Sequence, residues 1–318
     1  MTGSNKRALV TGGAGFIGSH LTEALVKENY QVVVLDNFST GHQSNLDPVA
    51  DSIEVVEGDV RDFQTVRQAT KGCDTVFHLA AVVSVPQTIE QPVESAAVND
   101  MGTMHVLETA RECSVANLVF ASSSAVYGDD PVLPKKEEMK PKPLSPYAVQ
   151  KITGEYYARL YHQIYGMKTT SLRFFNVYGP KQDPSSPYSG VISIFMSKAV
   201  QKVPPTIYGD GNQSRDFVYV TDVVRALLKA ANAEAAAGRS INVGTGISIN
   251  INQLWDTVAK LADLNLKSQY VPPRAGDIVA SVAAIDLAQS LLAFEPTESF
   301  AKGLEKTFRW YAASQSET

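Results

Sequence analysis

Cysteine is scarce in this 318-residue chain: Cys73 and Cys113 are its only two. Two cysteines are too few for a disulfide framework or for a cage of thiolate metal ligands. Both lie among apolar residues, as buried thiols do, and this favours a reducing compartment. The chain also lacks any run of about 18 consecutive apolar residues, and its start leads into a strand-like segment without the apolar core of a signal peptide. We therefore expect a cytoplasmic protein without a membrane span.

An excess of positive charge is lacking as well. The chain has 28 Lys and Arg against 33 Asp and Glu, so its formal net charge is −5. Such a balance does not favour binding to nucleic acid or to an anionic membrane surface. The five histidines are dispersed and no carboxylates cluster with them, so the sequence predicts no metal site. What remains is an ordinary globular composition with 44% hydrophobic residues.

The first half of the chain alternates β-branched runs with amphipathic stretches of helical length. Such alternation predicts an α/β fold in which helices cover both faces of a Rossmann-type, doubly wound parallel sheet. We expect strands at 7–11, 31–36, 53–57, 75–79, 117–122 and 169–175. We expect helices at 16–28, 63–70, 93–112, 146–165, 191–201, 220–237 and 252–264.

The second half is less regular and predicts a smaller α/β lobe. We expect residues 1–175 to form the first domain and residues 176–318 mainly the second, with some segments returning to the first. No linker of disordered composition separates the two, so we expect them to share a cleft.

A glycine-rich segment, Thr11–Gly18 (TGGAGFIG), follows the first strand and opens the first helix. Its glycines can be counted as Gly13, Gly15 and Gly18 or as Gly12, Gly15 and Gly18. Either spacing provides a tight turn and a helix N-terminus that faces an anion such as a pyrophosphate.

Asp36 ends the next strand, where a carboxylate can accept hydrogen bonds from ribose hydroxyls. Residues 37–39 contain no arginine that would bind a 2′-phosphate, so the sequence favours NAD over NADP. Asp59, which follows the third strand, is placed to reach the adenine, and the small Ala80 and Ala81 leave room for the cofactor. His78 is interpreted as a packed structural histidine.

Tyr147 and Lys151 are four residues apart in a predicted helix, so their side chains share one face. A neighbouring ammonium and a positively charged nicotinamide ring would lower the pKa of the phenol towards the working range of a general base. The serines at 122–124 end a predicted strand and offer hydroxyls for a substrate oxygen.

Together, the glycine segment, the serines before Val126-Tyr127-Gly128 and Tyr147-x-x-x-Lys151 resemble the extended short-chain dehydrogenase/reductase superfamily over essentially the whole chain. The resemblance implies that Tyr147 is the acid/base, that Lys151 holds the nicotinamide ribose, and that a serine orients the reacting hydroxyl. The matching serine is Ser123, although Ser122 or Ser124 could share its role. The catalytic set is therefore Ser122, Ser123, Tyr147 and Lys151. The cofactor positions are Gly12, Gly15, Phe16, Ile17, Gly18, Asp36, Asn37, Ser39, Thr40, Gly41, Asp59, Val60, Leu79, Ala80, Ala81, Asn99, Tyr147, Lys151 and Phe174.

The second half resembles the sugar-binding lobe of UDP-hexose 4-epimerases. Ser124 and Ala125 stand where dehydratases and decarboxylases of this superfamily carry acidic residues, which favours epimerisation. The resemblance implies that Asn176 contacts the sugar diphosphate, that Arg215 and Arg274 bind phosphate, and that Asp277 meets the uridine ribose. The full substrate set is Ser84, Val85, Ser123, Ser124, Tyr147, Asn176, Val191, Arg215, Arg274, Asp277 and Ser281.

Ser281 stands where, in this family, a tyrosine blocks N-acetylated sugars. Its small size favours interconversion of UDP-N-acetylglucosamine and UDP-N-acetylgalactosamine, with UDP-glucose and UDP-galactose as further substrates. Alternatives are an epimerase specific for UDP-glucose or UDP-uronate, and a catalytically silent NAD-binding scaffold or sensor. The resemblance also implies a homodimer formed through the helices at 93–112 and 146–165.

Overall fold

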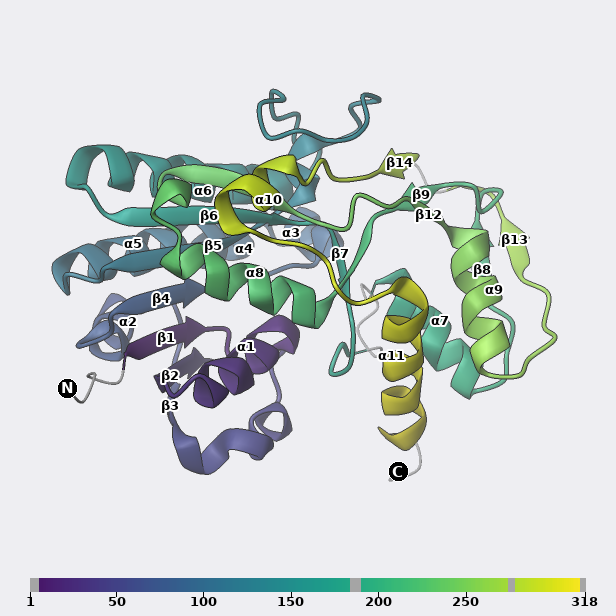
Figure 1. Ribbon diagram of the computed structural model, residues 1–318, viewed down its shortest axis with the longest axis horizontal. Helices are drawn as coiled ribbons and strands as arrows, with labels where there is room; N and C mark the ends of the chain where they lie inside the picture. The colour runs from purple at the N-terminus through teal and green to yellow at the C-terminus, as the bar shows by residue number, and fades with distance from the viewer. Residues whose placement is uncertain (1–5, 184–189, 274–277, 315–318) are drawn as a thin grey trace.

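The computed structural model describes residues 6–183, 190–273 and 278–314. Its centre is a seven-stranded, wholly parallel sheet in the order β11-β6-β5-β4-β1-β2-β3 (Figure 1). The strands are β1 (Arg7–Thr11), β2 (Gln31–Asp36), β3 (Ile53–Glu57), β4 (Thr75–His78), β5 (Asn117–Ser123), β6 (Lys168–Phe174) and β11 (Arg239–Val243). The predicted α/β class and parallel sheet are confirmed.

The order of the strands reverses beside β1, which pairs with β2 on one side and with β4 on the other. At such a switch point the loops that follow the two strands diverge and leave a crevice at their carboxyl ends. The glycine segment follows β1, so the fold places it at this crevice.

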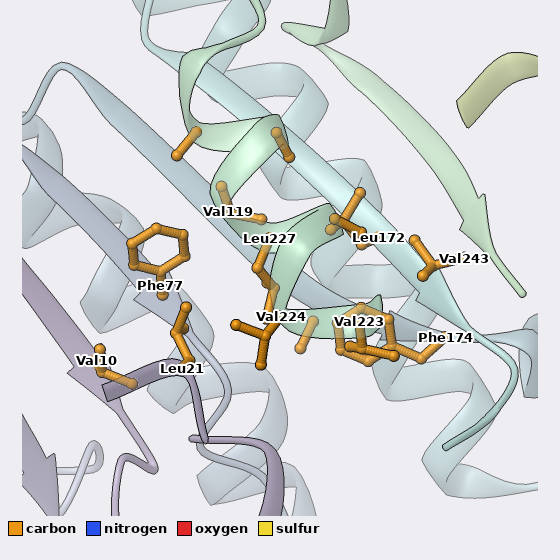
Figure 2. Packing of buried hydrophobic residues seen from close by; sticks show 14 of the residues in the cluster. Val10, Leu21, Phe77, Val119, Leu172, Phe174, Val223, Val224, Leu227 and Val243 are labelled. Carbon is orange, nitrogen blue, oxygen red and sulfur yellow. The ribbon is translucent and has the colours of Figure 1, made fainter. Parts of the chain in front are cut away.

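Two helical layers cover the sheet. One contains α1 (Phe16–Lys27), α8 (Val220–Asn232) and α10 (Asp286–Leu292), and the other contains α2 (Phe63–Thr70), α5 (Gly102–Glu112) and α6 (Pro146–Tyr165). Figure 2 shows the packing of the first layer, in which Val223, Val224 and Leu227 of α8 lie over Phe77, Val119, Leu172 and Phe174 of the sheet. Two segments of the second half, α8 and β11, are thus part of the first half's core.

The smaller lobe contains α7 (Val191–Val200), α9 (Ile251–Leu261) and α11 (Phe300–Ser314), which share one apolar core. Three short sheets belong to the second half of the chain. They pair β7 (Asn176–Tyr178) with β10 (Phe217–Tyr219), β8 (Thr206–Tyr208) with β13 (Gln269–Val271), and β9 (Ser214–Arg215) with β12 (Ile249–Asn250) and β14 (Ala280–Ser281). Short 3₁₀ helices are η1 (Gln43–Asn45), η2 (Asp47–Ser52), η4 (Ser124–Tyr127) and η5 (Glu234–Ala236).

Two predicted helices differ most from the observed ones, while the helix expected at 252–264 is observed as α9, Ile251–Leu261. The helix expected at 93–112 is divided into α4 (Pro92–Ala96), a π-helical turn, η3 (Ala97–Met101), and α5, and it follows the short α3 (Val85–Glu90). The helix expected at 220–237 ends at Asn232, because the chain becomes extended at Ala233 before it enters β11. The alanine-rich composition of 230–237 favours helix, and Glu234–Ala236 do form the short η5, but the α-helix itself does not continue beyond Asn232.

No helix in the described residues is long and apolar enough to cross a membrane.

Candidate active site

The glycine segment forms a turn in which three glycines leave no room for a Cβ. Gly12 has φ +72°, and a Cβ there would lie 2.8 Å from the backbone nitrogen of Ala80. A Cβ on Gly18 would lie 2.0 Å from the carbonyl oxygen of Gly12. Gly13 has no positive φ. A Cβ on Gly13 would nevertheless lie 2.7 Å from the Cγ1 atom of Val34, so Gly12, Gly13 and Gly18 all exclude a side chain, and the choice between the two spacings stays a prediction.

The helix that follows this turn has a free N-terminus. Gly15 is the N-cap of α1, and no side chain accepts a hydrogen bond there. The first turn also lacks acidic residues. Its N–H groups and the positive end of the helix dipole are thus available for an anion.

Asp36 joins the end of β2 to the glycine turn. Its carboxylate accepts hydrogen bonds from the backbone nitrogens of Ala14 and Phe38, both at 2.9 Å. These contacts hold a carboxylate beside the free helix N-terminus, where the predicted ribose contact requires it.

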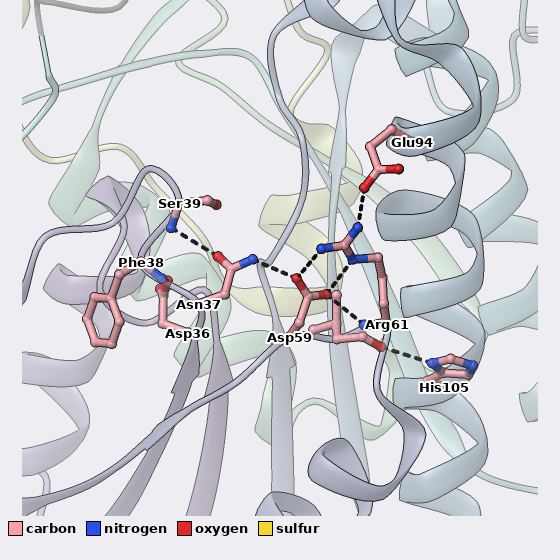
Figure 3. Close-up of polar contacts among 9 residues, drawn as sticks. Asp36, Asn37, Phe38, Ser39, Asp59, Arg61, Glu94 and His105 are labelled. Carbon is pink, nitrogen blue, oxygen red and sulfur yellow. Dashed lines mark hydrogen bonds and ion pairs between the residues drawn. The ribbon is translucent and has the colours of Figure 1, made fainter.

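Asn37, Ser39 and Asp59, three of the predicted cofactor positions, form one chain of hydrogen bonds (Figure 3). The Asn37 side chain donates to Asp59 at 2.7 Å and accepts from the backbone nitrogen of Ser39 at 3.1 Å. The loops that follow β2 and β3 are thereby tied together at the same edge of the sheet.

Arg61 completes this arrangement, and sequence reasoning missed it. Its Nε and Nη2 atoms each donate to the Asp59 carboxylate at 2.9 Å, and its Nη1 atom forms an ion pair with Glu94 of α4. Hydrogen bonding to Arg61 lowers the pKa of Asp59 to about 2. The spacing from Asp59 hinted at the first contact, but nothing in the sequence indicated that Glu94, 33 residues further along the chain, lies beside Arg61.

His78 has the structural role predicted for it. Its ring is buried and bridges two threonines, with Nδ1 2.7 Å from the Thr11 hydroxyl and Nε2 3.0 Å from the Thr103 hydroxyl. Burial lowers the pKa of His78 to about 3, so the ring is neutral at physiological pH.

Asn99 lies in the π-helical turn η3, a type of local irregularity that is frequent at functional sites. Its side chain accepts from the nitrogen of Val82 at 2.8 Å and donates to Gln150 of α6 at 2.7 Å. Asn99 therefore holds the loop after β4, which carries Leu79, Ala80 and Ala81, against the helix that bears the acid/base pair.

Tyr147 and Lys151 are oriented by the start of α6. Ser145 caps this helix by accepting a hydrogen bond from Ala148, and Pro146 occupies its first turn. The Lys151 Nζ atom lies 5.7 Å from the centre of the Tyr147 ring and donates to the carbonyl oxygen of Ala121 at 2.8 Å. The predicted pair thus shares one face and meets the end of β5.

The ionisation of this pair departs from the expectation in one respect. Burial raises the pKa of Tyr147, and a hydrogen bond with the Ser123 side chain lowers it only in part. Burial also lowers the pKa of Lys151 to about 8, against the opposing charge of Glu155. Desolvation thus dominates the pKa of Tyr147 in this structure, and the expected lowering, which also involves the nicotinamide charge, stays a prediction.

The three serines at the end of β5 have different surroundings. Ser123 forms the hydrogen bond with Tyr147 and accepts from the nitrogen of Ala125 at 3.2 Å. Ser122 is buried and donates to Glu155 at 2.5 Å, while Ser124 begins η4. Successive residues of a strand point to opposite faces, so Ser123 is the serine placed beside the phenol, and the hydroxyl of Ser122 is turned away from it.

Two of the predicted substrate residues lie on neighbouring short strands, and the other described ones lie on further elements. Arg215 on β9 is the register partner of Ser281 on β14. Asn176 begins β7 and is the register partner of Phe217 on β10, two residues after Arg215, and Val191 begins α7. Ser84 caps α3 by accepting from Gln87 at 3.1 Å, and Val85 follows it. Arg274 and Asp277 lie outside the described residues.

Asp216 organises this lobe and was also missed. Its buried carboxylate accepts from the backbone nitrogens of Thr245 (2.7 Å), Gly246 (2.9 Å) and Ala283 (3.1 Å). It thereby ties β9 to the strand-end loop after β11 and to the segment that carries Ser281. A single aspartate beside an arginine gives no sequence signal for such a role.

The remaining predicted cofactor positions share the same edge of the sheet. They belong to the first turn of α1, to the loops after β2 and β3, and to the end of β6: Phe16, Ile17, Thr40, Gly41, Val60 and Phe174. In the described part of the chain, no group of three or more His, Cys, Asp or Glu residues is arranged to hold a metal ion.

Residues 8–244 match the model of the NAD dependent epimerase/dehydratase family. The chain belongs to this family. A relative called a putative UDP-glucose 4-epimerase, from Methanocaldococcus jannaschii, is 40% identical over 95% of this chain and 97% of its own length.

Solved structures of family members agree with this assignment. The UDP-N-acetylglucosamine 4-epimerase from Methanobrevibacter ruminantium, in complex with UDP-N-acetylmuramic acid, is 36% identical, with a TM-score of 0.94 over 98% of this chain and 99% of that one. The UDP-glucose 4-epimerase of Thermus thermophilus, in complex with NAD, is 37% identical, with a TM-score of 0.87 over 96% of this chain and 98% of that one.

The cofactor of this family is NAD, and the residues present fit it. The turn at Gly12 and Gly18 admits no Cβ, as close approach of a backbone to a pyrophosphate requires. The uncapped N-terminus of α1 would hold the phosphates, and the Asp36 carboxylate would accept from the ribose hydroxyls. When bound, NAD supplies the acceptor for a hydride and the positive ring charge that favours the Tyr147 phenolate.

Proposed function

We propose that this protein is a UDP-sugar 4-epimerase that interconverts UDP-N-acetylglucosamine and UDP-N-acetylgalactosamine, and that it also accepts UDP-glucose and UDP-galactose. The observation that carries the substrate choice is the pairing of Ser281 with Arg215. A serine beside a phosphate-binding arginine leaves room for an acetamido group at C2 of the sugar.

The residues of this chain have defined tasks in the proposed reaction. Tyr147 removes the proton of the 4-hydroxyl, with Ser123 orienting that hydroxyl, as C4 is oxidised to a ketone. Lys151 keeps a positive charge beside the phenolate. Arg215 and Asn176 hold the diphosphate, so the 4-keto sugar can turn about this anchor and be reduced on its other face. Tyr147 then returns the proton to the new hydroxyl.

Incubation of the purified protein with UDP-N-acetylglucosamine, UDP-glucose and UDP-glucuronate, followed by NMR of the products, tests the proposal. We expect the C4 epimer of the first two and no net NADH in solution. Conversion of UDP-glucose alone, or of UDP-glucuronate alone, would replace the proposed substrate with one of the alternatives. No conversion of any sugar would instead favour an NAD-binding scaffold or sensor.

We also propose that the protein is a homodimer. Helix α6 exposes large apolar side chains along one side, and Leu160 and Ile164 have 44% and 65% of their surface accessible. Val149, Tyr156 and Tyr165 of the same helix are also exposed, as is Met101 of η3. A second copy that packs its own α6 against this side would bury a continuous apolar stripe.

A further inference from the structure

Glu155 continues the line of acid/base residues along α6. Tyr147, Lys151 and Glu155 follow one another at four-residue spacing and therefore share one side of the helix. Glu155 is almost completely buried. A carboxylate in such a place is costly unless it is paired and hydrogen-bonded.

Three elements of the sheet supply its partners. Arg173 of β6 donates from Nε at 2.9 Å and from Nη2 at 2.7 Å, which forms a buried bidentate ion pair. Ser122 of β5 donates at 2.5 Å and Ser240 of β11 donates at 2.8 Å. Glu155 thus connects the three neighbouring strands β5, β6 and β11 to α6.

One of these contacts borders directly on the acid/base pair. Ser122 stands between Ala121, whose carbonyl oxygen accepts from Lys151, and Ser123, whose side chain bonds with Tyr147. The bond from Ser122 to Glu155 therefore restrains the piece of backbone on which both catalytic contacts depend.

The charges around Lys151 give Glu155 a second role. The titratable groups that face this ammonium are Tyr147 and Glu155 on α6, His78 on β4, and Arg173 behind Glu155 on β6. His78 is neutral and Tyr147 is protonated in this structure. The Glu155 carboxylate is consequently the group that opposes the desolvation of Lys151.

We propose that Glu155 is a positioning residue for the reaction, which anchors the end of β5 through Ser122 and holds the charged form of Lys151 beside Tyr147. This inference rests on the proposed 4-epimerase function. Glu155 touches neither substrate nor cofactor in the proposal, and it acts through its two neighbours.

Substitutions of the two members of the buried ion pair, Glu155 and Arg173, are expected to shift the pH dependence of kcat in opposite directions. Glu155→Gln removes the negative charge near Lys151, so we expect the alkaline limb of the kcat–pH profile to move to lower pH by about one pH unit. Arg173→Met removes the positive charge behind Glu155, so the same limb is expected to move to higher pH. If the ion pair is purely structural, both variants lose stability and the alkaline limb does not move. Shifts of the same sign in both variants, or no shift in either, would overturn the charge role.

Each single variant leaves the other member of the ion pair buried without its partner and can therefore fail to fold. The double variant Glu155→Gln/Arg173→Met avoids this cost and provides the test in that case. The double variant removes both charges, of which Glu155 is the nearer to Lys151. We therefore expect the alkaline limb at lower pH than in the wild type, with a smaller shift than in Glu155→Gln. An unshifted limb in a folded double variant, judged by thermal unfolding, would overturn the charge role.

The anchoring role has its own matched pair. Ser122→Ala and Ser240→Ala each remove one hydroxyl bond to the same carboxylate, but only Ser122 adjoins the catalytic contacts. We expect kcat to fall about tenfold in Ser122→Ala and to stay within twofold of the wild type in Ser240→Ala. Equal effects on kcat would overturn the anchoring role.

The wild type separates this inference from the proposed function. A wild type that converts none of the UDP-sugars refutes the function itself. An active wild type whose five variants show none of these differences refutes only the role of Glu155.

Discussion

Ser281 and Arg215 are register partners on the neighbouring parallel strands β14 and β9. Register partners project from the same face of a sheet, so the residue expected to set sugar specificity lies beside the one expected to bind phosphate. The two are 66 positions apart in the sequence.

Ser281→Tyr is expected to separate the two substrate classes. The larger ring fills the space proposed for the acetamido group, so turnover of UDP-N-acetylglucosamine should fall at least tenfold while turnover of UDP-glucose stays within severalfold. Steady-state kinetics on both sugars measure the effect. Ser281→Ala is the control and should retain both activities; equal losses on both sugars in Ser281→Tyr would contradict the proposed role.

Tyr147→Phe removes the proposed acid/base without changing the shape of the ring. We expect turnover to fall by roughly 10² to 10⁴-fold while bound NAD and the melting temperature stay near those of the wild type. Tyr157→Phe, an exposed position on the same helix, should be fully active. Near-normal epimerisation by Tyr147→Phe would reject the assignment.

Lys151→Met is expected to lose activity without losing stability. Burial lowers the pKa of Lys151 from 10.5 to about 8. The unfolded chain therefore binds the Lys151 proton more tightly than the folded chain, so the buried charge destabilises the fold. This cost is fully present below pH 8 and is relieved as the pH rises from 8 to 10.5. That cost corresponds to about 3 kcal/mol in the free energy of unfolding.

At pH 7, Lys151→Met should therefore melt at or above the wild-type temperature, even though the bond to Ala121 is lost, while turnover falls at least a hundredfold. Thermal unfolding at pH 7 and at pH 10 checks the sign, because the advantage of the variant should shrink as the pH rises. A variant that is much less stable than the wild type at pH 7 would show that the charged lysine stabilises the fold.

Arg61→Ala tests the support of Asp59. Asp59 remains ionised at pH 7 even at its ordinary pKa of 3.8, so any effect comes from orientation and not from protonation. We expect NAD to bind about five- to tenfold more weakly, as measured by calorimetry on cofactor-free protein. Arg67→Ala removes another ion pair on the surface, with Glu112, and should leave NAD binding unchanged.

Ile164→Glu tests the proposed dimer. A charge at this exposed apolar position of α6 should yield monomers in light scattering at concentrations at which the wild type is dimeric. Val279→Glu makes the same change at an exposed apolar position of the smaller lobe and should remain dimeric. A monomeric wild type would refute the proposal.

Local patterns in the sequence determined the parts of this protein that depend on short stretches of chain. Runs of β-branched residues predicted the first three strands to the residue: β1 and β2 are apolar where they are buried, and the more exposed edge strand β3 keeps the β-branched Ile53, Val55 and Val56. The Tyr147–Lys151 spacing predicted a shared face, because helical geometry links residues four apart.

Contacts between distant segments were decided only by the tertiary structure. The lack of room for a Cβ at Gly12 depends on the approach of Ala80, 68 residues later. The bridge from Asp59 through Arg61 to Glu94, and the four hydrogen bonds that satisfy Glu155, come from strands and helices that the sheet order brings together. Ser122 and Ser123 are alike in sequence, and they differ because the pleat turns one towards a buried carboxylate and the other towards the phenol.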